Sequence, residues 1–252
     1  MAQASKQNRP DGPKHLIKHW TAISDNPNHP DAKAGVRRVL NDIQRVHTDT
    51  DIVTYIEKAA AGKRVLDIGM ASHSEVYWGE RWPHRRFAKV ASTILGIDIL
   101  ESLIGRLAAD GYNVRVADAT SDMDLGERFD LVVASDVIEH VDNPVGLMRF
   151  CARHLTPGGR VLVSTPNPFS RKFIRQFQRQ KQIVVNLDHV IWVTPTMALE
   201  IAHRSGLQLK HLHLIKPMSK WKSAIKRLTW RYEPIEYSFP DYLYEFAIPD
   251  VR

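Results

Sequence analysis

Three aspartates in the first half of the chain lie in or directly after short segments that are predicted to be strands. Asp67 falls in the run 65–69, Asp98 ends the run 94–98, and Asp118 follows the run 113–117. Continuous apolar runs of this length are typical of strands that are buried on both faces of a parallel sheet. Ligands of such sheets bind at the carboxyl ends of the strands, where a carboxylate can accept ribose hydroxyl groups. The three aspartates therefore predict one ligand-binding edge.

Two histidines could take a proton from a substrate. His140 follows the apolar run 129–135 in the pair Glu139-His140, and His189 follows Asp188. The ordinary pKa of imidazole lies close to neutrality, so either ring could act as a general base. Each could equally be a hydrogen-bonded structural histidine, and the sequence leaves both readings open.

A divalent metal ion is a further candidate ligand at the same place. Asp136, Glu139 and His140 are spaced i, i+3, i+4, which would put their side chains on one face of a helix. A capping aspartate followed by Glu-His in a turn is the interpretation we favour. We therefore predict no metal site, and keep this set as the weaker alternative.

The elements that position these residues alternate along the chain. Strands are predicted at 64–68, 93–98, 113–117, 129–135 and 160–165, with helices at 84–92, 100–110 and 143–154. This alternation predicts an α/β fold with a Rossmann-like, doubly wound, mostly parallel sheet. A helix at 196–205 and a strand at 207–215 follow, and the aromatic run 236–248 predicts an antiparallel edge strand.

Four segments are expected along the chain. Residues 1–30 predict an irregular arm, and 31–62 a helical leader whose pattern breaks near 48–50. Residues 63–215 form the predicted core. Residues 216–252 predict a basic amphipathic segment and the final edge strand, packed on the core.

Charge and composition indicate where the protein works. A single cysteine, Cys151, permits no internal disulfide, and no apolar run approaches the length that spans a bilayer, so we expect a cytoplasmic protein. Between residues 168 and 232, thirteen lysines and arginines stand against Asp188 and Glu200, while the whole chain carries only +7. This region predicts an anionic partner, although a solvated basic face is the simpler alternative. Trp221 and Trp230 among cations suit the headgroups of an anionic membrane, which predicts peripheral contact at its inner face.

The order of these motifs resembles class I S-adenosylmethionine-dependent methyltransferases. The matching stretches are Val-Leu-Asp-Ile-Gly, Gly-Ile-Asp, Ala-Asp-Ala, Phe-Asp-Leu-Val-Val-x-x-Asp-Val-Ile-Glu-His-Val and Leu-x-Pro-Gly-Gly, over residues 60–215. The chain is most similar to the branch that holds ubiquinone-type O-methyltransferases and the small methyltransferases of glycan biosynthesis. The resemblance implies S-adenosylmethionine as cofactor, and His140 and His189 as candidate catalytic bases. It also implies these cofactor contacts: Asp67, Gly69, Ala71, His73, Asp98, Ile99, Asp118, Ala119, Ser135, Asp136 and Val137.

One turn departs from the family pattern. The expected Gly-x-Gly-x-Gly reads Gly69-Met70-Ala71-Ser72-His73, which makes a close backbone approach harder at two positions. The interval from Asp67 to Asp98 is also long, at 31 residues. Either the extra segment 73–86, with Tyr77, Trp78 and Trp82, covers the cofactor, which we favour, or cofactor binding has decayed. His73 could touch cofactor or substrate, or simply pack the loop. The missing Gly-x-Gly-x-x-Gly argues against a nicotinamide enzyme.

The expected function is methylation of a sugar hydroxyl, in a glycan or glycolipid of cell-surface polysaccharide biosynthesis, by in-line transfer with a histidine base. The acceptor would be a small molecule or glycan, anionic if the basic region 168–232 binds it. The alternatives are an RNA-directed methyltransferase and a decayed methyltransferase fold that binds a membrane. Nucleic acid is disfavoured because residues 135–138 lack the Asn/Asp-Pro-Pro-aromatic motif of amino-directed base methylation and Cys151 lies within a predicted helix. The oligomeric state is not predicted.

Overall fold

The computed structural model describes residues 19–73, 78–219, 221, 228, 230 and 232–249. The chain forms two compact units, residues 1–44 and 45–252. In the first unit, the 3₁₀ helix η1 (Trp20–Ala22) precedes α1 (Pro30–Asp42). α1 begins at His29, whose ring Nδ1 accepts the Asp31 backbone N–H, and Pro30 supplies a φ that suits a first helical turn.

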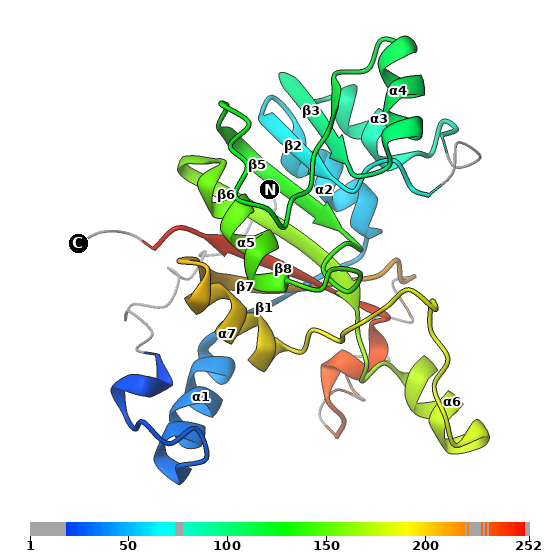
Figure 1. Cartoon of the computed structure of the whole chain (residues 1–252). Coiled ribbons are helices and arrows are strands. Elements are labelled where there is room, and N and C mark those ends of the chain that lie inside the picture. Colours follow the sequence, from blue (N-terminus) through cyan, green and yellow to red (C-terminus); the bar gives the residue numbers. More distant parts are fainter. Residues whose placement is uncertain are drawn as a thin grey trace, which may run out of the picture. The chain divides into compact units, whose positions relative to one another are not determined.

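The second unit is built on a mixed sheet (Figure 1). Among the described residues the sheet has eight strands, in the order β1-β7-β8-β6-β5-β2-β3-β4. Five neighbouring strands run parallel, in the order β6, β5, β2, β3 and β4. β8 runs antiparallel to both of its neighbours, β6 and β7. The bounds are β1 (Gln44–Thr48), β2 (Arg64–Ile68), β3 (Thr93–Asp98), β4 (Val114–Val116), β5 (Phe129–Ser135), β6 (Leu155–Pro166), β7 (Gln208–Ile215) and β8 (Asp241–Ala247).

The predicted α/β fold and its antiparallel strand are confirmed. β8 lies between β6 and β7, so it is an interior strand and not the outermost one. Both of its edges are paired, with β6 and with β7, and its side chains are also covered on both faces: Tyr242, Leu243, Tyr244 and Phe246 are each at most 1% exposed.

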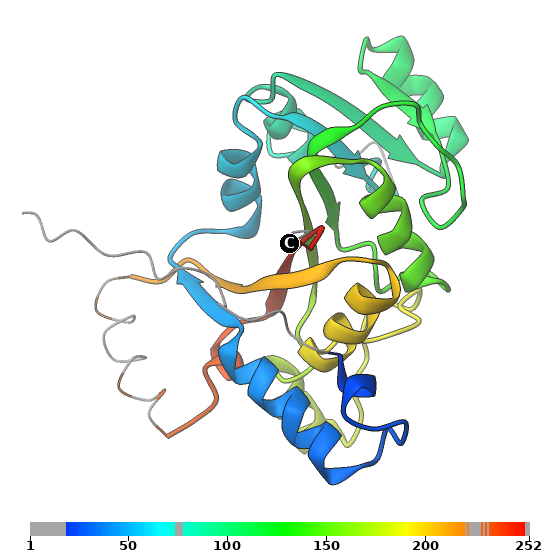
Figure 2. The ribbon, with the colours of Figure 1, turned by 90° about the vertical axis from the view of Figure 1, so that its left-hand side faces the viewer.

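Helices cover both faces of the sheet. α2 (Ile52–Ala60) lies on one face, and α5 (Pro144–Arg153) and α7 (Pro195–Arg204) lie on the other (Figure 2). In the core between α2 and the sheet, Ile56 of α2 belongs to one cluster with Leu131, Leu162 and Leu243. The remaining helices are α3 (Pro83–Ala88), α4 (Glu101–Ala109), α6 (Arg171–Gln180) and the 3₁₀ helix η3 (Ile235–Ser238).

The predicted helical leader contains a strand. β1 separates α1 from α2, and the break expected near 48–50 falls where β1 ends and Asp51 caps α2 by accepting the Thr54 N–H. β1 is short and mostly polar, so its pattern was absorbed into the helical spacing on either side. Most of the amphipathic segment predicted at 216–231 lies outside the described residues. Within the described residues, no helix has the length and apolar composition needed to cross a bilayer.

Candidate active site

The turns after β2 and β5 pack directly on each other. Gly69 directly follows β2 and has a φ of +73°, and a Cβ atom there would lie 2.5 Å from Val137 Cγ2. Its N–H donates to the carbonyl oxygen of Ile97 at 2.9 Å. Only glycine meets both conditions, because other residues disfavour this φ and would collide with Val137. The first turn of the predicted cofactor edge is thus fixed against the second.

Asp98 organises the same edge from the end of β3. Its Oδ2 accepts the Ala71 N–H at 3.0 Å, and its Oδ1 accepts the Leu100 N–H at 3.1 Å. The residue is 9% exposed, and the following Ile99 is 67% exposed. A carboxylate oxygen has two lone-pair sites, so each oxygen can still accept a hydroxyl group.

The altered glycine turn adopts a left-handed backbone conformation, which glycine adopts more easily than other residues. Ser72 and His73 both have a φ of +58°. This left-handed conformation costs a residue with a side chain roughly 1–2 kcal/mol. Two indoles hold the turn: Trp78 Nε1 donates to the Ala71 carbonyl, and Trp82 Nε1 to the Met70 carbonyl, each at 2.9 Å.

Asp67 points into the protein beneath this turn. Its Oδ2 lies 2.8 Å from His84 Nδ1, and the two residues are 4% and 1% exposed. A buried polar group is tolerated when it has a hydrogen-bond partner, which His84 provides. Asp67 therefore supports the turn from below, and a direct cofactor contact by Asp67 stays a prediction.

Asp118 and Ala119 complete the edge after β4. Asp118 is exposed, and its Oδ1 accepts both the backbone N–H and the hydroxyl of Thr120 at 2.7 Å. Ala119 is 7% exposed. The Ala117 N–H donates to the Asp98 carbonyl at 3.0 Å, which places this turn beside Asp98.

The turn after β5 carries an unusual backbone and an unused hydroxyl. Asp136 has a φ of +53°, and its Oδ1 accepts the Ser164 hydroxyl at 3.0 Å. The Ser135 Oγ is buried and has no hydrogen-bond partner among the described residues. A buried hydroxyl without a partner is costly unless a ligand satisfies it.

Next to this turn, the fold gathers three imidazoles around one carboxylate. The rings of His140 and His189 meet edge to face, with centroids 4.6 Å apart. His140 Nδ1 lies 3.1 Å from Asp188 Oδ2, and His73 Nε2 lies 3.9 Å from the same oxygen. The two histidines predicted from sequence are therefore neighbours, and the altered glycine turn contributes the third.

The loop that carries Asp188 and His189 is tied to the β5 turn by its backbone. The N–H groups of Val190 and Ile191 donate to the Glu139 carbonyl at 2.9 and 3.4 Å. Burial and the nearby His140 lower the pKa of His189, so its ring is neutral at pH 7.

Glu139 is a buried acid in this centre. It is 1% exposed, and its carboxylate has no well-aligned hydrogen-bond partner among the described residues, although the Thr165 side chain lies beside it. Burial, reinforced by the charge of Asp136, raises the pKa of Glu139 to about 8. The side chain is therefore largely protonated at neutral pH.

The potential metal ligands differ from the set that the sequence indicated. The ligand atoms of Glu139, His140 and His189 lie within 4.8 Å of one another, as do those of His73, His140 and Asp188. Asp136, the first member of the sequence-derived set, belongs to neither group. Its carboxylate accepts the Ser164 hydroxyl, and loop residues take its place.

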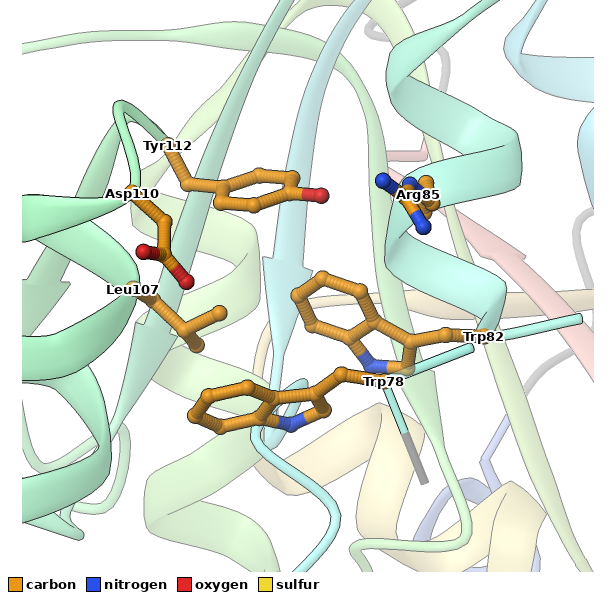
Figure 3. A pocket seen from close by; sticks show the side chains of 6 residues that line it. All are labelled: Trp78, Trp82, Arg85, Leu107, Asp110 and Tyr112. Atoms are coloured by element: carbon orange, nitrogen blue, oxygen red, sulfur yellow. The ribbon is translucent and has the colours of Figure 1, made fainter. Parts of the chain in front are cut away.

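A pocket opens beside the rebuilt turn, between α3 and α4 (Figure 3). Its volume is about 430 Å³. The two tryptophans that hold the turn form one wall, so the extra segment shapes the pocket as well as the turn. The lining residues are Trp78, Trp82, Arg85, Leu107, Asp110 and Tyr112.

A family model described as a methyltransferase domain matches residues 43–212, which is more than half of the chain. The chain belongs to this methyltransferase family. It is similar to the ubiquinone biosynthesis O-methyltransferase of Coxiella burnetii (strain RSA 493 / Nine Mile phase I), at 26% identity over 181 residues, 64% of this chain and 74% of that protein. The protein of the same name from Thiobacillus denitrificans is 28% identical over 165 residues, 60% of this chain and 67% of that protein.

Solved structures of low sequence identity share the fold of this methyltransferase. An S-adenosylmethionine-dependent methyltransferase from Mesorhizobium loti aligns with a TM-score of 0.50 at 22% identity, covering 76% of this chain and 95% of that one. A methyltransferase of the same cofactor class from Archaeoglobus fulgidus aligns with a TM-score of 0.52 at 20% identity, covering 77% and 89%. The predicted class I methyltransferase fold is thus confirmed.

The methyltransferase family and the solved structures of this fold imply S-adenosylmethionine as the cofactor. The residues at the strand ends fit it: the Asp98 carboxylate keeps unused lone pairs, the Ser135 hydroxyl lacks a partner, and Gly69 leaves no side chain between the turns. The individual contacts assigned to these side chains remain predictions.

Three residues of the centre were missed or left undecided by the sequence. Asp188 was noted only as the neighbour of His189, and Glu139 only as a weak metal ligand. His73 was left between a ligand contact and loop packing, and it lies at the histidine centre. Acid-histidine pairs at 139–140 and 188–189 were the available signal, but their convergence depends on the path of a long loop.

Proposed function

We propose that this methyltransferase methylates a hydroxyl group of a sugar, in a glycan or glycolipid of cell-surface polysaccharide biosynthesis, with His140 as general base. The 3.1 Å separation of His140 Nδ1 from Asp188 Oδ2 carries the proposal: it is an ion-pair distance, and the present angle of the two groups does not form a hydrogen bond. A carboxylate on one ring nitrogen orients the imidazole and leaves Nε2 to accept a proton. A hydroxyl acceptor must lose a proton during transfer, so an oriented base suits this acceptor.

When bound, S-adenosylmethionine supplies an electrophilic methyl group. The residues of the chain then have separate tasks. His140 takes the hydroxyl proton at Nε2, and the Asp188 carboxylate stabilises the resulting imidazolium. His189 stays neutral and packs edge to face on His140, which fixes the plane of that ring. The Val190–Glu139 backbone hydrogen bond keeps Asp188 and His189 at the centre.

The acceptor class is supported by charge and by the relatives. The two relatives described above are named O-methyltransferases, which supports oxygen as the methylated atom. The basic region 168–232 suits a phosphate, as on a sugar built on a lipid carrier. α6 contributes Arg171, Lys172, Arg175 and Arg179 to this region.

The same region supports peripheral contact with an anionic membrane. Figure 1 shows α6 and the loop after it standing out from the sheet. α6 is anchored by Phe173, which is 7% exposed and packs edge to face on Trp192, while Phe177 is 55% exposed. In the loop, Val184 is 56% and Leu187 is 96% exposed. Exposed apolar residues among cations match the headgroup level of an anionic bilayer.

The test measures methyl transfer from labelled S-adenosylmethionine to lipid-linked and nucleotide-linked sugars, with RNA as a comparison acceptor. We expect a sugar to be methylated, and we expect His140→Ala to slow turnover by roughly 10²–10⁴-fold without changing cofactor affinity. His29→Ala, in the first unit, is the control. A wild-type rate in His140→Ala would remove it as the base. Label in RNA alone would favour the RNA-directed alternative, and cofactor-free folded protein would favour a decayed binding module.

A further inference from the structure

A second group of ligand-type side chains lies on the sheet face covered by α2. His211 and His213 occupy alternate positions of β7, so their side chains share one face. Glu245 of β8 is the register partner of His211. The group shares no residue with the histidine centre of the active site.

The three side chains converge on one point. Glu245 Oε2 lies 2.7 Å from His213 Nε2 and 3.6 Å from His211 Nδ1, and the three ligand atoms lie within 4.8 Å of one another. Ligands at about 2.0–2.2 Å from a shared ion are about 3–3.5 Å apart, so only small shifts would be needed. Two imidazoles and a carboxylate form a set that suits Zn²⁺ and similar first-row divalent ions.

Neighbouring residues hold two of the three ligands in orientation. The Tyr55 hydroxyl of α2 lies 3.2 Å from His213 Nδ1 and 3.4 Å from His213 Nε2, and that Nε2 lies 2.7 Å from Glu245 Oε2. Arg160 Nη1 donates to the other carboxylate oxygen, Glu245 Oε1, at 3.4 Å. Partners of this kind behind the ligands fix the tautomer and direction of imidazole and carboxylate in metal sites.

One ligand atom has no other task. His211 Nδ1 is buried and has no hydrogen-bond partner among the described residues. The Arg160 guanidinium and the His213 ring both lie within ion-pair distance of the Glu245 carboxylate. His213 and Glu245 have side chains 4% and 12% exposed, whereas His211 is 29% exposed, which leaves an entry for an ion at its end of the group.

We propose that His211, His213 and Glu245 bind a first-row divalent metal ion such as Zn²⁺. The ion joins β7 to β8 by side-chain ligands, in addition to their backbone hydrogen bonds. Arg160 adds a positive charge near the ion, so the site binds more weakly than one with an unopposed carboxylate.

The test uses the full chain, stripped with a chelator, and titrates it with Zn²⁺ by calorimetry, with the bound metal counted after dialysis. Because His140 belongs to both potential ligand groups of the active site, the titration is done in His140→Ala. We expect one Zn²⁺ per chain in this background, and none after a further His211→Ala or Glu245→Gln. His203→Ala, at an exposed position of α7, is the matched control and should keep the ion.

A Co²⁺ titration of the same variants gives a second readout, since its visible absorption reports imidazole and carboxylate coordination. Circular dichroism verifies that each variant is folded. No Zn²⁺ in His140→Ala would overturn the proposal. So would an unchanged stoichiometry in His140→Ala/His211→Ala, which would assign this group a purely structural role as a hydrogen-bonded cluster.

Discussion

At the scale of single residues, the active centre combines groups in opposite protonation states. Glu139 is a buried acid with a pKa raised to about 8, and the pKa of His189 is lowered. Both are therefore mainly neutral at pH 7, which leaves Asp188 beside His140 as the carboxylate partner of the proposed base. Environments that move the pKa values of neighbouring groups in this way are typical of functional sites.

Glu139 should make the protein less stable as the pH rises. Its folded pKa lies above its ordinary value of 4.5, so the native state holds the proton more tightly than the unfolded state. The free energy of unfolding should therefore fall between about pH 4.5 and 8, by roughly 3–5 kcal/mol for this group alone. Glu139→Gln removes the titrating group, so the part of the fall in the free energy of unfolding that Glu139 causes should be absent in this variant.

Urea denaturation of both proteins at pH 5 and pH 8.5, with a chelator present, measures the difference. Glu101→Gln, at an exposed position in the first turn of α4, is the control and should keep the wild-type slope. An identical pH dependence in wild type and Glu139→Gln would show that Glu139 is ionised in the native state.

At the scale of elements, the extra segment between β2 and β3 replaces what glycines would provide. The turn keeps Ser72 and His73 in the left-handed region, and Trp78 and Trp82 bind its carbonyls from outside. This arrangement supports the interpretation that the extra segment holds the altered turn in place at the cofactor edge.

Trp78→Phe should weaken S-adenosylmethionine binding while leaving the fold intact. The phenyl ring keeps the apolar contact but loses the hydrogen bond to the Ala71 carbonyl, which is worth about 0.5–1.5 kcal/mol, or roughly two- to tenfold in affinity. Calorimetric titration gives the affinity, and thermal melting verifies the fold. Trp230→Phe is the matched control, because it loses an indole bond to Ser238 on another part of the chain. Equal affinities in all three proteins would mean that the indole does not support the turn.

The basic region should bind anionic vesicles through exposed apolar residues of α6 and its loop. Phe177→Ser with Leu187→Ser should reduce sedimentation with phosphatidylglycerol vesicles several-fold, because these side chains would enter the headgroup layer. Met123→Ser, another exposed apolar residue, should have no effect. Undiminished binding of the double variant, or equal binding to zwitterionic vesicles, would contradict an insertion through this region.

Most of the sheet could be predicted from local pattern, and the exceptions have physical causes. β2, β3 and β5 are continuous apolar runs that no other element explains, and their predicted bounds match the structure. β1 is short and mostly polar, so the helical spacing of the residues on either side obscured its strand pattern. The interior place of β8 depends on which strands it pairs with, and those partners are distant in sequence.

The active centre was less accessible to sequence reasoning for the same reason. His140 lies directly after a predicted strand, so its place at the edge followed from the fold. The contact of Asp188 with His140 and His73 depends on the path of the loop between β6 and α7, which no local pattern specifies. The burial of Glu139 likewise arises only when that loop covers it.

At the scale of the whole molecule, one sheet positions three separate chemistries. The carboxyl ends of β2, β3, β4 and β5 form the cofactor edge, and the loop before α7 closes the histidine centre beside it. The opposite half of the sheet, β7 and β8, carries the proposed metal site. Ligands of parallel sheets bind at the carboxyl ends of the strands. The altered glycine turn lies at that edge, so its conformation decides whether the cofactor can bind.

The measurement that tests this account most directly is calorimetric titration of the purified protein with S-adenosylmethionine and its demethylated product. We predict binding in the micromolar range, about −8 kcal/mol. Asp98→Asn should weaken it at least tenfold, while Asp122→Asn, whose side chain is fully exposed, should not change it. Absence of binding to either compound by the folded wild-type protein would contradict the account, because the rebuilt turn would then have closed the cofactor edge.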